Sequence, residues 1–190
     1  AGSETAIHGT WEKGPGIEVF QKMQEKFGKL DIIAEDLGFL TPSVLKLVKD
    51  TGFPGMKVLE FAFDSREESD YLPHNYTTNC VVYTGTHDNN TIRGWYEVMD
   101  EADRQLSVDY MNNAHTPGDE IHWDFVRLAL SSVAKLAVIP VQDYLGLGGE
   151  ARINTPSTLG ENWRWRMLSG EITDEIAVKC RKMAKLYGRV

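Results

Sequence analysis

The sequence predicts an α/β fold in which helices cover a parallel β-sheet. Four short apolar segments have the length and the branched side chains of buried strands. Segments with apolar residues at helical spacing precede and separate them along the chain. Strands that alternate with helices are typical of parallel sheets, because two neighbouring parallel strands need a long crossover connection.

In the N-terminal part of the chain, the sequence predicts a helix, then a first strand, and then a second helix. A helix is expected over residues 15–28, where a Gly-Pro-Gly turn leads into apolar residues at helical spacing. Residues 30–34 are too few for a helix and rich in branched side chains, which predicts a buried strand. The second helix is expected over 41–52, with Thr41 as its N-cap, a proline at its first position and Gly52 as its stop.

The rest of the chain continues this alternation. We expect the second, third and fourth strands at residues 56–63, 80–83 and 136–141. Helices are expected over residues 101–112 and 122–135, between the third and fourth strands, and a last helix follows Thr173 as its N-cap.

Four strands limit the possible architectures. A complete (β/α)8 barrel needs about 250 residues and eight strands, so a chain of 190 residues with four strands could supply only half of one. A doubly wound open sheet is the alternative on pattern alone. No G-x-G-x-x-G turn follows any of the expected strands, which argues against the dinucleotide-binding form of that fold. Because the sequence contains no internal repeat or clear linker, we expect residues 1–190 to form a single unit.

Composition and charge argue against several classes of protein. The formal net charge is −8, which argues against a nucleic-acid-binding surface. Cys80 and Cys180 lie far apart and match neither a disulfide framework nor a zinc site, so we expect two buried thiols. No apolar stretch approaches the roughly 18 residues of a membrane span, and the first residues do not resemble an export signal. The chain opens without Met in a loop-like stretch, so we expect a piece of a longer protein.

Polar side chains follow each of the four expected strands. They are Glu35 and Asp36 after the first, Asp64 after the second, His87 and Asp88 after the third, and Gln142 and Asp143 after the fourth. The carboxyl ends of parallel strands meet at one edge of the sheet, where ligands bind in folds of this class. Each residue also has a structural alternative: Glu35 could be a loop carboxylate, and Asp88 could support a turn in its Asp-Asn-Asn context.

Seven segments, taken together and in order, carry a resemblance to a known family. They are 11–16 (WEKGPG), 32–38 (IIAEDLG), 53–59 (FPGMKVL) continuing through 61–64 (FAFD), 72–76 (LPHNY), 83–89 (YTGTHDN), 152–156 (RINTP) and 162–166 (NWRWR). The chain resembles the amylomaltase-type 4-alpha-glucanotransferases, also called disproportionating enzymes, of glycoside hydrolase family 77, along nearly its whole length. The resemblance implies the C-terminal half of a (β/α)8 barrel, comprising about strands 5 to 8.

This resemblance also implies a reaction and a set of site residues. The reaction is a retaining transglycosylation of alpha-1,4-glucans, in which maltodextrins are disproportionated. By motif, Glu35 is the acid/base and Asp88 is the carboxylate that stabilises the oxocarbenium-like transition state. The residues that the resemblance assigns to glucan binding are His87, Asp64 and Asn154, with His74 and Asn75 as rim residues.

The family's Asp nucleophile lies in an Arg-x-Asp-His type of segment, which this sequence does not contain. A retaining mechanism requires such a carboxylate. We therefore expect the chain to be inactive alone and to need an N-terminal half of the barrel. The competing hypothesis is a non-catalytic half-barrel that binds glucan or associates with itself through an open sheet edge. The resemblance further implies chemistry without a metal or cofactor, and a bacterial cytoplasmic or plastid setting. From charge and hydropathy, we expect no nucleic-acid or membrane partner.

Overall fold

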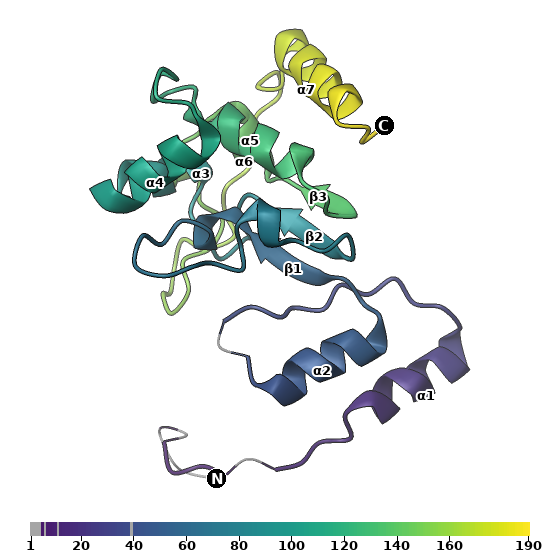
Figure 1. The fold of residues 1–190 in the computed structure, drawn as a ribbon. Coiled ribbons are helices and arrows are strands. Elements are labelled where there is room, and N and C mark those ends of the chain that lie inside the picture. Colours follow the sequence, from purple (N-terminus) through teal and green to yellow (C-terminus); the bar gives the residue numbers. More distant parts are fainter. Residues whose placement is uncertain (1–4, 6, 11, 39) are drawn as a thin grey trace.

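A computed structural model describes residues 5, 7–10, 12–38 and 40–190 of the chain (Figure 1). The α-helices are α1 (Ile17–Phe27), α2 (Pro42–Thr51), α3 (Ile92–Glu97), α4 (Glu101–Met111), α5 (Ile121–Ser131), α6 (Val141–Leu145) and α7 (Asp174–Leu186). The strands are β1 (Gly55–Val58), β2 (Cys80–Tyr83) and β3 (Leu136–Val138), and single 3-10 turns are η1 (Leu59–Phe61), η2 (Pro73–Asn75) and η3 (Gly149–Ala151).

The three strands form one parallel sheet in the order β1-β2-β3. Gly55 pairs with Cys80 at one end of the first ladder, and Val81 pairs with Leu136 in the second. Helices α3, α4 and α5 lie on one side of the sheet, whereas α1 and α2 pack against each other at some distance from it (Figure 1). The expectation of a parallel α/β fold is therefore confirmed for the described residues.

The prediction of a first strand at residues 30–34 is wrong, because these residues, all of them described, are extended but are not part of the sheet. One backbone hydrogen bond joins the segment to the start of β1, from Ala34 N to Pro54 O at 2.9 Å. Pro54 has no N–H to return, and the next free donor, Met56 N, is taken by the Asp36 carboxylate at 2.6 Å. The Asp36 side chain thus accepts the hydrogen bond that a backbone carbonyl of a neighbouring strand would accept in a β-ladder.

Two other expected strands end early, and two short helices were missed. The strand expected over 56–63 turns into η1 after Val58, and the one expected over 136–141 ends at Val138, since Pro140 is the N-cap of α6. The helices α3 and α6 were not expected; with six and five residues, they are too short to show helical periodicity in the sequence.

The longer helices were predicted within a few residues, and their caps explain where they stop. Gly52, the C-cap of α2, has a left-handed backbone conformation with φ 68°, which is typical of a glycine that ends a helix. The Thr173 hydroxyl accepts the Ile176 N–H at the start of α7. Arg189 then ties the C-terminal end to α5, donating to the carbonyls of Leu130, Ser132 and Ala134 at 2.6–2.9 Å.

The main core lies between the sheet and α5, with Phe125 at its centre. Phe125 is fully buried, and its ring centroid lies 5.5 Å from that of Trp95 and 5.8 Å from that of Phe63, both in edge-on geometry. Such pairs add to the stabilisation from area burial alone. Of the two cysteines, Cys80 is buried in this core and Cys180 is half-buried on α7, and both are free thiols.

Replacing Phe125 by Ala is expected to destabilise the chain by about 3–5 kcal/mol, since the substitution opens a cavity that three edge-on aromatic neighbours cannot fill. Urea unfolding followed by circular dichroism measures the change. Val178→Ala on α7 is the control, because Val178 is 65% exposed and should change stability by no more than about 0.5 kcal/mol. Equal effects of the two substitutions would contradict this placement of the core.

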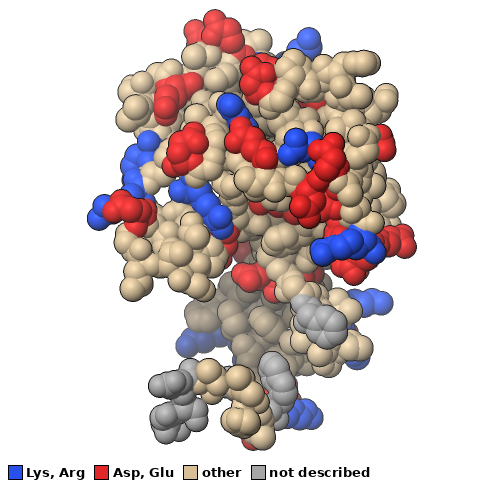
Figure 2. All heavy atoms as spheres, turned by 90° about the vertical axis from the view of Figure 1, so that its left-hand side faces the viewer, with Lys and Arg blue, Asp and Glu red and all other residues tan. Residues whose placement is uncertain are grey.

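The surface agrees with the charge balance of the sequence. On the face shown in Figure 2, acidic and basic side chains are interspersed and no continuous basic patch is visible. Among the described residues, none of the helices has both the length and the apolar character needed to cross a bilayer.

Candidate active site

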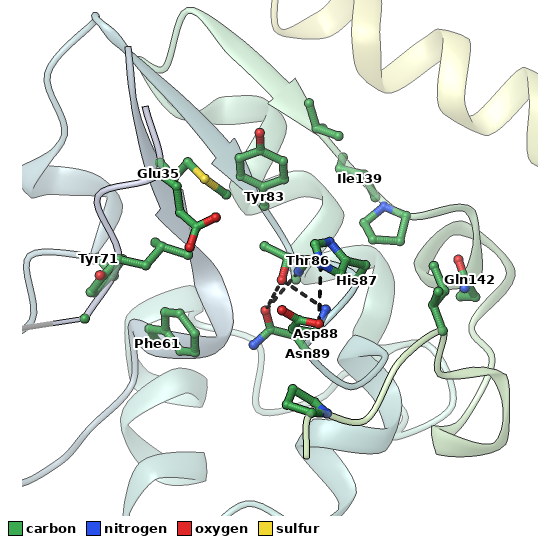
Figure 3. A pocket seen from close by; sticks show the side chains of 18 of the residues that line it. Glu35, Phe61, Tyr71, Tyr83, Thr86, His87, Asp88, Asn89, Ile139 and Gln142 are labelled. Atoms are coloured by element: carbon green, nitrogen blue, oxygen red, sulfur yellow. Dashed lines mark hydrogen bonds and ion pairs between the residues drawn. The ribbon is translucent and has the colours of Figure 1, made fainter. Parts of the chain in front are cut away.

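An open cleft of about 1620 Å³ lies at the carboxyl ends of the strands (Figure 3). Its floor includes Met56 of β1, Tyr83 of β2 and Val138 of β3, one residue from each strand. The walls come from the loops that follow these strands and from the 153–166 segment, which contributes Trp163 and Trp165. The sheet thus places loops that are distant in sequence around one cavity, as the alternation of strands and helices predicted.

Glu35 lies on the wall of this cleft, exposed to solvent, and its side chain projects into the cavity (Figure 3). The residues directly before and after Glu35 each form a hydrogen bond that holds this part of the chain next to β1. Ala34 donates to Pro54 O at 2.9 Å, and the Asp36 carboxylate accepts the Met56 N–H at 2.6 Å. Because side chains alternate along an extended segment, anchoring Asp36 to β1 leaves Glu35 free to face the cleft.

Asp88 lies in a tight turn directly after β2. Asn89 Oδ1 accepts hydrogen bonds from Thr86 N at 3.0 Å and from Thr86 Oγ1 at 2.8 Å, and Asn89 N donates to Thr86 O at 3.2 Å. These bonds fix the backbone on both sides of Asp88. The turn chemistry that the sequence offered as a structural alternative is present, and it orients a carboxylate that lines the cleft.

Hydrogen-bond donors surround Asp88. Asn154 Nδ2 donates to Asp88 Oδ1 at 2.5 Å, and His87 Nε2 lies 3.4 Å from the same oxygen. Arg152 Nη2 donates to the Asp88 carbonyl at 2.6 Å, while Arg152 Nε donates to Asn154 O at 2.8 Å. These contacts hold the carboxylate and its backbone in one orientation.

Trp163 packs against His87 beside this carboxylate. The centroids of the two rings are 5.2 Å apart with planes inclined by 34°. Trp163 adopts φ 66°, a left-handed conformation that costs energy for a bulky residue. Its N–H donates to Ile153 O at 2.7 Å, and Arg166 donates to its carbonyl at 3.0 Å. The strained residue thus presents an indole ring, 55% exposed, to the cleft.

Asp64 also lines the cleft, and an arginine already engages it. Arg66 donates from Nε to Oδ1 at 2.8 Å and from Nη2 to Oδ2 at 2.7 Å. This paired hydrogen bonding with Arg66 lowers the pKa of Asp64 to about 2. A ligand hydroxyl that binds Asp64 must share its oxygens with, or displace, this exposed guanidinium.

Three of the predicted site residues are not part of the cleft lining. Asn154 reaches the site only through its hydrogen bond to Asp88, and His74 and Asn75 contact other parts of the chain. His74 Nδ1 is 3.1 Å from the hydroxyl of Tyr110 on α4, and Asn75 Nδ2 donates to Ser69 O at 3.1 Å. Both residues belong to η2. Their contacts fix the loop between β1 and β2, whose residues Ser69 and Tyr71 do line the cleft.

A buried layer of polar groups beneath the cleft was not predicted as part of the site. Asp143 of α6 accepts the Thr84 hydroxyl and, at 2.9 Å, the Ile92 N–H, so it joins the two ends of the loop that carries Asp88. Burial raises the pKa of Asp143 to about 6. The sequence placed Asp143 after a strand, but nothing in its neighbours shows that it is only 1% exposed.

Within the described part of the chain, no cluster of three or more His, Cys, Asp and Glu side chains has the arrangement of a metal site. The cleft instead combines carboxylates, amide groups and exposed indole rings. Such groups recognise polyhydroxylated ligands, since carboxylates and amides bind hydroxyls and indole rings pack against the apolar faces of sugar rings. The fold and cleft therefore define an α/β protein with a carboxylate site at the C-terminal edge of its sheet.

Comparison with known proteins identifies the family. The model of the glycoside hydrolase family 77, described as 4-alpha-glucanotransferase, matches residues 1–172, and the chain belongs to that family. A 4-alpha-glucanotransferase of Clostridium butyricum is 47% identical over 189 residues, covering 99% of this chain and 38% of that protein. One from Thermus thermophilus is 45% identical, covering all of this chain and 39% of the relative.

A solved structure supports the same conclusion. Amylomaltase from Streptococcus agalactiae, in complex with acarbose, superposes with a TM-score of 0.90 at 36% identity. The alignment covers 98% of this chain and 37% of that one. The chain thus spans less than two fifths of the length of the relatives it matches. Trp11, the first residue of the matching segments, lies outside the described residues.

Proposed function

We propose that this chain is the part of a 4-alpha-glucanotransferase that carries the acid/base Glu35 and the transition-state-stabilising carboxylate Asp88. The observation that carries the proposal is that both side chains line one cleft, although Glu35 precedes β1 in the sequence and Asp88 follows β2. The relatives that match along nearly the whole chain bear this name, and the amylomaltase of similar fold binds acarbose. The substrate that we propose is an alpha-1,4-glucan such as a maltodextrin.

In the proposed retaining reaction, an Asp nucleophile from a segment outside these 190 residues attacks the anomeric carbon. Glu35 gives its proton to the leaving glycosidic oxygen, and a covalent glycosyl-enzyme forms. The deprotonated Glu35 then removes the proton from an acceptor hydroxyl, and the glucan is transferred. Asp88 stays ionised and stabilises the positive charge that develops on the sugar ring. His87, Asp64 and Asn154 bind hydroxyl groups of the donor.

For the architecture, we propose that the described sheet and the extended segment at residues 30–34 correspond to about strands 5 to 8 of a (β/α)8 barrel. The whole of residues 1–190 would then act as one unit of that barrel. The extended segment supports this proposal, because it already approaches β1 in the order that a further strand would occupy. His74 and Asn75 would shape the rim through the loop that they fix. For localisation, bacterial and chloroplastic or amyloplastic relatives support a bacterial cytoplasmic or plastid setting.

A second candidate function is a non-catalytic half-barrel that binds glucan or associates with itself. One observation favours association: β3 is an edge strand of the sheet, and its residues Leu136 and Val138 are 47% and 38% exposed. Apolar edge strands recruit partners. Light scattering gives the oligomeric state of the chain, and a binding assay gives its affinity for maltodextrin. A chain that is monomeric and has no affinity for maltodextrin would count against this second function.

Complementation tests the proposed enzyme function. The chain alone is expected to release no glucose from maltotriose. Mixing or fusing it with the remaining part of the Clostridium butyricum relative, which this chain does not match, should restore maltodextrin redistribution. The measurement is glucose release and product length by chromatography, with each part alone as the control. Disproportionation by the chain alone would show that it contains a nucleophile other than the one proposed.

A further inference from the structure

The side chain of Glu60 lies beneath the loop that joins β2 to α3. Glu60 belongs to η1, and its backbone N–H donates to Thr84 O at 3.2 Å. A Cβ atom at Gly85 would lie 2.6 Å from Glu60 Oε1, so the carboxyl group occupies the space that any larger residue at 85 would need. Oε1 is buried and has no hydrogen-bond partner among the described residues. The mechanism proposed above makes no use of this carboxyl group.

The Glu60 carboxyl group lies next to Gly85, at the start of the turn that carries Asp88. A Cβ atom added at Gly85 would also lie 3.2 Å from the Asn89 side chain and 3.3 Å from the Asn90 carbonyl, so these groups surround the same space as Glu60 Oε1. Asn89 closes the turn through Thr86 and interacts with the Glu60 carboxyl group through its side-chain amide. Any change in the size or charge of the Glu60 side chain is therefore transmitted to the backbone that carries Asp88.

We propose that Glu60 is a positioning residue for Asp88, because its carboxyl group packs under Gly85 and against Asn89 and thereby sets the conformation of residues 86–89. The effect of Glu60 on the conformation of the turn does not depend on the proposed function. Only the consequence for catalysis rests on the proposed function, in which Asp88 stabilises the transition state.

The charged groups that face Glu60 come from three directions. Asp143 approaches from α6, and Arg152 approaches from the segment after η3. A smaller cavity of about 370 Å³ on the other side is lined by Glu60 together with Asp64, Asp100 and Asp103. Of these groups, Asp143 opposes a negative charge at Glu60 and Arg152 favours it.

These surroundings make Glu60 neutral at physiological pH. Burial first, and then the Asp143 carboxylate, raise the pKa of Glu60 to about 9, while Asn89 and Arg152 lower it by less. Asp143, with its pKa raised to about 6, ionises first. When Glu60 ionises at alkaline pH, it repels Asp143 and must gain water beneath Gly85. The turn at residues 86–89 cannot keep its conformation in that state.

NMR titration of the 190-residue chain between pH 6 and pH 10.5 tests the inference. In the wild-type chain, the amide resonances of Asp88 and Asn89 are expected to shift with a midpoint near pH 9. In Glu60→Gln, which keeps the shape and cannot ionise, these resonances should show no transition near pH 9. Glu101→Gln, at an exposed position on α4, is the matched control and should titrate as the wild type does. Constant amides in the wild type, or equal shifts in Glu60→Gln, would overturn the inference.

Two further measurements keep the result independent of the variant's folding. If Glu60→Gln fails to give a folded circular dichroism spectrum, the Glu60 carboxyl carbon is followed in labelled wild-type chain. Equal midpoints for that carbon and the Asp88 amide support the inference, and unequal midpoints overturn it. Thermal melts give the sign. Since burial favours the protonated form of Glu60, the wild type is expected to lose stability relative to Glu60→Gln as pH rises from about 4.5 to 9.

The pH dependence of activity tests whether the conformation of the turn affects catalysis. Both complemented enzymes share the alkaline loss of rate that comes from deprotonation of the general acid Glu35. Above pH 9, the ratio of the wild-type rate to the Glu60→Gln rate is expected to fall about tenfold per unit, because each unit reduces the neutral fraction of Glu60 tenfold. A parallel fall in both enzymes would overturn the positioning role. If the complemented wild type is inactive at every pH, the proposed function fails, and the NMR titration alone decides this inference.

Discussion

Replacing Glu35 by Gln in the complemented enzyme is expected to reduce maltodextrin disproportionation by about 10²–10⁴-fold. The amide cannot protonate the leaving oxygen and cannot accept a proton from the acceptor hydroxyl. Its shape is unchanged, and Glu35 is an exposed residue of an extended segment, so the fold should be unaffected. The measurement is the initial rate of glucose release from maltotriose, with Asp31→Asn, exposed and four residues upstream, as the control of near wild-type rate.

A donor with a better leaving group separates a chemical defect from a structural one. An alpha-maltosyl fluoride needs no proton to leave, so the first step of the Glu35→Gln enzyme should recover with this donor while transfer to the acceptor stays slow. Undiminished activity of the variant on maltotriose would show that Glu35 is not the acid/base. A loss that the fluoride does not relieve would place the defect in binding or folding.

Replacing Asp88 by Asn is expected to lower kcat by about 10²–10³-fold while changing KM little. The amide oxygen can still accept the hydrogen bond from Asn154 Nδ2, and the turn closed by Thr86 and Asn89 does not involve the Asp88 side chain. What the substitution removes is the negative charge, which matters when positive charge develops on the sugar ring in the transition state.

Steady-state kinetics measure this split, and glucan binding to the inactive chain serves as its control. Because an interaction made only in the transition state affects kcat and kcat/KM together, equal losses in both parameters are the expected pattern. A large rise of KM with unchanged kcat would mean that Asp88 binds the ground state and has no stabilising role. An unaltered enzyme would exclude Asp88 from the site altogether.

Much of the fold could be read from local sequence patterns. The helices over α1, α2, α4, α5 and α7 follow from apolar spacing and from cap residues such as Thr173 and Gly52, since these signals act within one or two turns of chain. The third strand expected from the sequence is β2 with the same bounds. Its four residues are apolar on both faces, which is typical of a strand buried between neighbours.

The wrong prediction of a strand at residues 30–34 has a physical origin. A strand exists only when a neighbour provides the partners of its hydrogen bonds, and residues 30–34 have the composition of a strand without such a ladder. Pro54 has no N–H to donate there, and the Asp36 side chain accepts the Met56 N–H. That carboxylate lies 20 residues from its partner in sequence, so no local pattern shows the contact.

For the site, the sequence determined which residue types follow each strand, and the motifs determined the family. Glu35, Asp64, His87 and Asp88 were all expected at the carboxyl ends of strands, and all four line the cleft. The tertiary structure alone decided how they are supported. It showed that Arg66 engages Asp64 and that Trp163 packs on His87 from a strained conformation.

The buried layer beneath the cleft depends entirely on the tertiary structure. Glu60 and Asp143 are ordinary acidic residues in the sequence, far apart along the chain, and their charge and chemistry are set by burial, by each other and by the loop between Thr84 and Ile92. The sequence specifies these side chains. Only folding removes them from water, and the loss of solvation in a medium of low dielectric is what shifts their pKa values.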